Sequence, residues 1–127
     1  MRGIDDFLGL WRIERVIEDR LAGQRGSFEG RATLAPAGEH WPWSETGQLR
    51  LGAGAPFAAS RRYLWRAEAG RIAVFFEDGR PFHSFDPEGR PEAHHWCDPD
   101  DYQVAYDFSG WPEWRATWQV RGPRKDY

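Results

Sequence analysis

The chain of 127 residues is long enough for one domain, and its 40% hydrophobic and 29% charged residues are typical of a globular protein with a packed core. Seventeen basic and 20 acidic residues give a net charge of -3, which excludes a strongly basic nucleic-acid binder. No apolar run approaches the ~20 residues of a membrane span, and the unusual feature is the aromatic content of 16%, with eight tryptophans.

The beginning of the chain shows no apolar stretch of the kind found in secretory signals, and Cys97 is the single cysteine. We therefore expect a cytoplasmic protein with one domain over residues 1–127, without a cofactor and without nucleic-acid or membrane partners. The only helical candidate is a short turn around Asp5 to Leu8, where Asp5 or Asp6 could act as the cap.

The rest of the chain alternates between apolar and polar residues, which is the pattern of half-buried strands. Turn signals rich in glycine, proline and aspartate separate the strands at short spacing. The fold class predicted is all-β: a single antiparallel up-and-down β-barrel of about 9–10 strands with a short N-terminal helical turn, because consecutive hairpins dominate and closure removes exposed edges. The strands predicted are Trp11–Glu18, Phe28–Leu34, Trp43–Leu51, Ala59–Ala67, Ile72–Glu77, Pro81–Asp86, Ala93–Cys97, Tyr102–Phe108 and Glu113–Arg121.

The dipeptide Asp78-Gly79 predicts a hairpin with a two-residue type I′ turn. This turn would pair Phe76 with Pro81, Val74 with His83 and Ile72 with Phe85. His83 would then point into the barrel, and Phe75, Phe82 and Ser84 would face outward.

The next turn signal, Pro87–Gly89, predicts a three-residue hairpin loop that places His95 opposite Pro81. His95 and Cys97 would then face the interior with His83. A slip of one residue would instead turn His94 and Trp96 inward, so both orientations remain open.

Charged residues occur on otherwise apolar strand faces at Arg15, Glu45 and Arg61. A buried charge is costly unless it is paired, so these residues indicate either a buried Arg–Glu bridge or a polar cavity. Two arginines against one glutamate leave an excess cation, which favours an anionic ligand. The candidate ligand-binding residues are Arg15, Glu45, Arg61, Tyr63, His83, His95 and Tyr102.

Four tryptophans on the predicted inward faces could either fill the barrel or line a slot for a planar molecule: Trp43, Trp65, Trp114 and Trp118. The leading interpretation is a protein that binds a small aromatic or anionic molecule. The alternatives are an enzyme with His83 or His95 as general acid–base, and a filled structural protein, such as a homodimer paired through Phe75 and Phe82. Further hypotheses are a metal or haem at the inward histidines and a reactive Cys97.

The sequence Gly9-Leu10-Trp11 resembles the Gly-x-Trp motif that opens the first strand of lipocalins and fatty-acid-binding proteins, the calycins. The resemblance implies a barrel whose closed end is sealed by Trp11 under a basic residue of the last strand, here Arg121 or alternatively Arg124. The whole chain also resembles an uncharacterised domain family, on phrases that include Asp78–His83 and His95–Cys97. That resemblance implies no activity.

Overall fold

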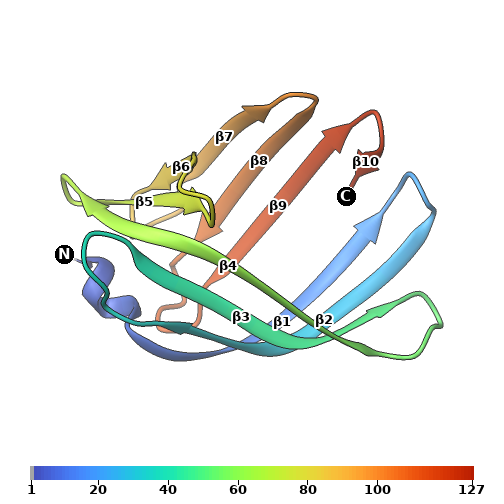
Figure 1. The fold of residues 1–127 in the computed structure, drawn as a ribbon, viewed down its shortest axis with the longest axis horizontal. Helices are drawn as coiled ribbons and strands as arrows, with labels where there is room; N and C mark the ends of the chain where they lie inside the picture. Colours follow the sequence, from blue (N-terminus) through green and yellow to red (C-terminus); the bar gives the residue numbers. More distant parts are fainter. Residues whose placement is uncertain (1) are drawn as a thin grey trace.

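The computed structural model describes residues 2–127, which form a short 3-10 helix and ten strands in two antiparallel sheets (Figure 1). Nine of these strands overlap the nine predicted ones, and the two-residue β10 was not predicted. In the described part of the chain, no helix has the length and apolar character needed to cross a membrane. The elements are η1 (Ile4–Phe7), β1 (Gly9–Asp19), β2 (Gln24–Leu34), β3 (Trp41–Leu51), β4 (Phe57–Glu68), β5 (Arg71–Phe76), β6 (Pro81–Phe85), β7 (Glu92–Cys97), β8 (Asp100–Asp107), β9 (Arg115–Gly122) and β10 (Lys125–Asp126).

The strands follow the up-and-down order that the sequence predicts, but the predicted closed barrel is wrong. One sheet has the order β1-β2-β3-β4-β5-β6 and the other the order β10-β9-β8-β7, and no strand ladder within residues 2–127 joins them. The predicted hairpin at Pro87–Gly89 is also wrong. The segment after β6 is bound to β8 instead, because Phe108 N donates to Gly89 O and Tyr106 N donates to Pro91 O, each at 2.9 Å.

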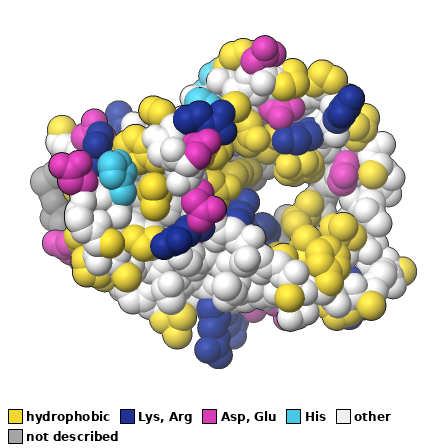
Figure 2. Space-filling model, viewed as in Figure 1, with side chains coloured by type: hydrophobic (Ala, Val, Ile, Leu, Met, Phe, Trp, Pro, Cys, Tyr) yellow, Lys and Arg dark blue, Asp and Glu magenta, His cyan; other side chains and the backbone are white. Residues whose placement is uncertain are grey.

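The other junction between the sheets lies between β1 and β10. Arg20 N donates a hydrogen bond of 2.7 Å to Asp126 O, and the side chains of the two residues form an ion pair at 3.3 Å. These contacts hold the sheets together beside the β1–β2 turn. Between β9 and β1 the ribbons diverge, and the space-filling view shows an opening there with basic and apolar side chains at its border (Figures 1 and 2). The fold is therefore an open cup rather than a sealed barrel.

The β5–β6 hairpin differs from the predicted type I′ turn. Gly79 N donates to Phe76 O and Phe76 N donates to Arg80 O, so the turn has three residues and ends at Gly79 with φ 91°. Phe75 consequently pairs with Pro81, and an irregularity in the ladder restores the predicted pairing of Val74 with His83.

The extra residue in this ladder changes the side on which Phe82 lies. Phe82 is buried in the core, contrary to the prediction that it faces outward. Phe75 is also buried, since the ring of His40 and the guanidinium of Arg66 cover it on the outer side. Neither residue is exposed enough to form the predicted homodimer contact.

An aromatic cluster fills one end of the cup. Phe7 is 0% exposed and meets Trp65, Trp111 and Trp114 edge to face at centroid distances of 5.5, 4.9 and 5.6 Å. The indole N–H of Trp11 donates to Phe7 O at 2.8 Å and ties β1 to the helix. Such T-shaped contacts add specific geometry to the burial of large apolar surfaces.

The predicted seal of this end by Arg121 is wrong. Arg121 lies at the opposite end of β9 from Trp114, where its guanidinium is 4.0 Å from the Asp126 carboxylate. The cation at the aromatic cluster is Arg2, 4.1 Å above the ring of Trp111. The predicted cap of the helix is corrected too, since Gly3 occupies the N-cap and Asp6 accepts a hydrogen bond from Gly3 N at 2.9 Å.

Candidate functional site

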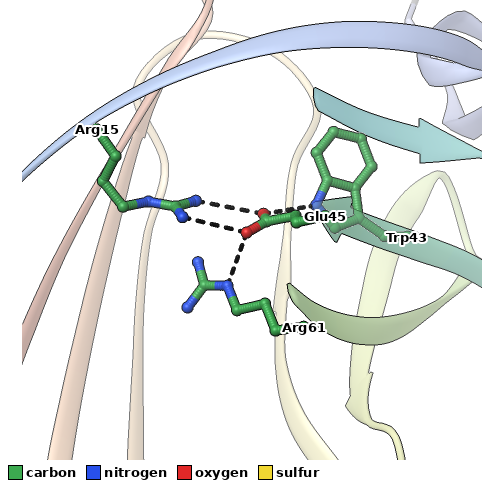
Figure 3. A network of polar contacts seen from close by, with 4 residues as sticks. All are labelled: Arg15, Trp43, Glu45 and Arg61. Atoms are coloured by element: carbon green, nitrogen blue, oxygen red, sulfur yellow. Dashed lines mark hydrogen bonds and ion pairs between the residues drawn. The ribbon is translucent and has the colours of Figure 1, made fainter. Parts of the chain in front are cut away.

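The charged residues predicted to face inward meet around the carboxylate of Glu45, which is buried on β3 (Figure 3). Arg15 on β1 donates from both terminal nitrogens at 3.1 and 3.2 Å, and Arg61 on β4 donates from Nε at 2.7 Å. The indole N–H of Trp43 donates at 2.9 Å. Each of the two carboxylate oxygens therefore accepts a hydrogen bond from an arginine. Such pairing offsets the free-energy cost of burying the charge.

The sheet register explains why these side chains meet. Glu45 lies directly opposite Arg61, whereas Arg15 is in register with Phe28, two rows of inward positions away from Glu45. The row between them contains Gly30 opposite Gly47. Because these positions carry no side chain, the Arg15 side chain can extend across the row to reach Glu45.

The same two glycines permit an unusually close approach of β2 and β3. A Cβ atom on Gly47 would lie 2.3 Å from Glu29 O and 2.8 Å from the ring of Phe28. Any larger residue would therefore collide with the neighbouring backbone, and glycine is the residue that fits here.

The electrostatics of the network favour an ionised Glu45. Burial alone would raise the pKa of its carboxyl, but the charges of Arg61 and Arg15 and the hydrogen bonds from Arg15 and Trp43 outweigh it and lower the pKa. Two guanidiniums against one carboxylate leave one net positive charge. The side chains of Arg15 and Arg61 remain 32% and 37% exposed, so part of this charge stays accessible to solvent.

Arg61 also connects the network to the opposite sheet. Its guanidinium lies 4.7 Å from the ring of Trp118 on β9 and 5.3 Å from the ring of Tyr63. A guanidinium over an indole is a favourable cation–π arrangement. The sequence places Trp118 on an inward face but does not predict its contact with Arg61, because this contact depends on how the two sheets face each other.

The remaining predicted site residues form a second, packed group around Phe82. Its ring lies 5.9 Å from Tyr63, 5.5 Å from His95 and 5.3 Å from Tyr102. The ring of Phe82 thus fills the space between these side chains, where the sequence predicted a cavity. The structure therefore divides the seven predicted residues into the charged network and an aromatic wall beside it.

His83 belongs to the inner side of this wall. Its Nε2 is 2.8 Å from the Tyr106 hydroxyl, and its Nδ1 is buried without a partner among the described residues. Burial, assisted by the charge of His95, lowers the pKa of His83 to about 4. The imidazole is therefore neutral near pH 7, and it hydrogen-bonds a neighbour as expected of a core histidine.

The structure has one of the two orientations that the sequence leaves open for β7. His95 and Cys97 lie on its half-buried side, whereas His94 and Trp96 are exposed. His94 pairs with Asp101 on the outer surface. No group of three histidine, cysteine, aspartate or glutamate side chains in residues 2–127 is arranged to hold a metal ion.

Beyond the network, the inner faces of β3 and β4 are apolar toward the open end of the cup, whereas that of β1 continues with Ile17 and ends at Asp19. Phe57 is 48% exposed and lies on the same face of β4 as Arg61. The prediction missed Phe57 because its first residue for this strand was Ala59, although the alternation Phe57, Ala59, Arg61 continues to it. A pocket of about 290 Å³ opens next to this region, lined by Ile17, Asp19, Gln24, Gly26, Leu51 and Tyr127.

Comparisons with known proteins identify a family but no function. No curated protein and no solved structure matches the chain. The model of DUF6314, a family of unknown function, matches residues 7–127, which is nearly the whole chain. The chain therefore belongs to this family of unknown function.

Proposed function

We propose that this protein binds a small anionic molecule in the open half of the cup, at the Arg15–Glu45–Arg61 network. The observation that carries the proposal is the net positive charge of this network, held by a buried carboxylate while both guanidiniums keep part of their surface exposed. A ligand carboxylate or similar anion would neutralise that charge through bidentate hydrogen bonds.

Glu45 acts in this proposal as a positioning residue. It holds Arg15 and Arg61 in fixed orientations, so that little side-chain entropy is lost when an anion binds. Trp118 beside Arg61 offers a flat apolar surface, which suits a ligand with an aromatic or apolar part.

A calycin-like relationship rests on the Gly9-Leu10-Trp11 motif and the up-and-down strand order, in an open rather than closed form. A cytoplasmic location stays a prediction. The neutral His83 is hydrogen-bonded to Tyr106, which favours binding over general acid–base catalysis by this residue.

A titration with 8-anilinonaphthalene-1-sulfonate, an anionic aromatic probe, tests the proposal. The tryptophan emission of the protein should change on binding, because Trp118 lies beside Arg61. We expect the Arg61→Gln variant to bind the probe about tenfold more weakly, since one charge-assisted contact is lost. The matched control is Arg62→Gln, which removes the same charge from the next, outward-facing residue on β4.

Equal loss of probe affinity in both variants would contradict the proposal, because it would mean that only the overall charge matters. Native mass spectrometry of the purified protein adds an independent reading. A non-covalent mass that is present in the wild type and the Arg62→Gln variant but absent in the Arg61→Gln variant would support the site.

A further inference from the structure

The inner face of the larger sheet changes from charged to apolar along its strands. The inference drawn from this change rests on the proposed function. Next to the charged network comes the small row with Gly30 and Gly47. The following row, in register with Arg15, contains Phe28, Leu49 and Phe57. The next row contains Ile17, Gly26 and Leu51, before β1 and β2 end with Asp19 opposite Gln24. The buried carboxylate thus lies further from the open end than these rows, in which Phe57 and Leu51 are exposed apolar side chains.

The dimensions of this surface limit the size of a ligand. From Arg61 to Phe57 is four residues along β4, or about 13 Å at ~3.3 Å per residue. Tyr127 faces the same end, against the pocket lined by Ile17 and Leu51. The apolar path is therefore long enough for one short chain or ring system, with its far end at the opening.

The charges along this path also favour one orientation of a bound ligand. The two guanidiniums lie at its inner end, whereas the carboxylate of Asp19 lines the pocket at the outer end. An anion would be attracted inward and repelled at the opening. A ligand with its charged group outward would place its apolar part against ionised groups, which is costly.

We propose that the ligand is an amphipathic monocarboxylate that enters with its carboxylate first. The carboxylate binds the guanidiniums of Arg61 and Arg15, and the apolar body lies along the rows that end at Phe57 and Leu51. A single negative charge matches the single excess positive charge of the network. The apolar part adds affinity in proportion to the surface that it removes from water.

A series of three probes tests this orientation: octanoate, butanoate and 1-octanol, each titrated against the tryptophan emission of the full chain. Octanoate should bind at least about tenfold more tightly than butanoate, since its four further methylene groups lie on the apolar rows. It should also bind at least about tenfold more tightly than 1-octanol, which has no charge for the guanidiniums.

Two serine variants locate the apolar part of the ligand. Phe57→Ser should weaken octanoate about fivefold and leave butanoate unchanged, because only the longer chain reaches Phe57. The control is Val16→Ser, which removes an apolar side chain that is 64% exposed on the outer face of β1. It should bind both acids as the wild type does.

The failures of the two proposals are distinguishable. If octanoate and butanoate bind equally and both depend on Arg61, anion binding stands and the amphipathic ligand is refuted. The amphipathic ligand is equally refuted if Phe57→Ser and Val16→Ser weaken octanoate alike. If no acid binds in a way that depends on Arg61, the proposed function itself fails.

Discussion

Replacing Glu45 by glutamine removes the charge around which the site is organised, while it keeps the size of the side chain. The two oxygens of Glu45 accept hydrogen bonds from Arg15, Arg61 and Trp43 at 2.7–3.2 Å. A glutamine oxygen can retain part of these contacts, but its amide group would face a guanidinium donor. Two arginine charges would then lie within the cup without a counter-ion.

The expected cost follows from the burial of the three charged groups. Removing one partner of a fully buried ion pair costs about 3–5 kcal/mol. Arg15 and Arg61 are 32% and 37% exposed, so water screens part of the charge that they would leave uncompensated. We therefore expect Glu45→Gln to lower the free energy of unfolding by about 2–3 kcal/mol, or roughly 10 °C in Tm for a chain of this size.

Urea unfolding at pH 7, followed by tryptophan emission, measures this change. The matched control is Glu29→Gln, an exposed carboxylate on the neighbouring strand β2, which should change stability by less than about 0.5 kcal/mol. Because the pKa of Glu45 is lowered in the folded state, its contribution is present above its ordinary value of 4.5 and is lost as the pH falls through the folded pKa. A Glu45→Gln variant as stable as the Glu29→Gln control would refute the view that the carboxylate organises the site.

Three further substitutions test other parts of the structure. The pKa of His83 is lowered from 6.5 to about 4, so its contribution to stability is complete above pH 6.5 and is lost as the pH falls toward 4. Urea unfolding at pH 7 and pH 5 should therefore show a loss about 2 kcal/mol smaller in His83→Gln than in the wild type, and equal losses would contradict the burial argument. Gly47→Ala should destabilise by about 1–3 kcal/mol in thermal unfolding, because its Cβ would lie 2.3 Å from Glu29 O, whereas Gly3→Ala meets open space and serves as the control. Phe7→Ala should lower the free energy of unfolding by about 3–5 kcal/mol in urea, and a loss below about 1 kcal/mol would show that the aromatic cluster is not tightly packed.

The sequence predicts much of the local structure because alternation and turn residues act over short distances. The strand β3 was expected over Trp43–Leu51 and occurs over Trp41–Leu51. The alternation along β7 limited the orientation of His95 to two possibilities, and the structure has the one with His95 inward, even though the predicted hairpin does not form. The half-buried side of a strand is set by its own alternation, so it survives an error in the connection.

The errors arise where the outcome depends on distant parts of the chain. Whether β6 pairs with β7 is decided by competition with β8, which binds the carbonyls of Gly89 and Pro91. The position of Phe82 depends on one extra residue in the β5–β6 turn and its ladder. For the site, alternation placed Glu45, Arg15 and Arg61 on inward faces, and their meeting at one carboxylate required the glycine row that brings β2 and β3 close together.

The aromatic cluster at the closed end has a consequence for the order of folding. It brings Phe7, near the start of the chain, against Trp111 and Trp114, about a hundred residues later. The hairpins of the larger sheet close short loops, whereas the cluster must close almost the whole chain, which costs more conformational entropy. We expect the hairpins to form first and the cluster to assemble after the rate-limiting step. Stopped-flow kinetics of Phe7→Ala would then show faster unfolding with nearly unchanged refolding. The cluster would in that case determine how long a folded molecule lasts rather than how quickly it forms.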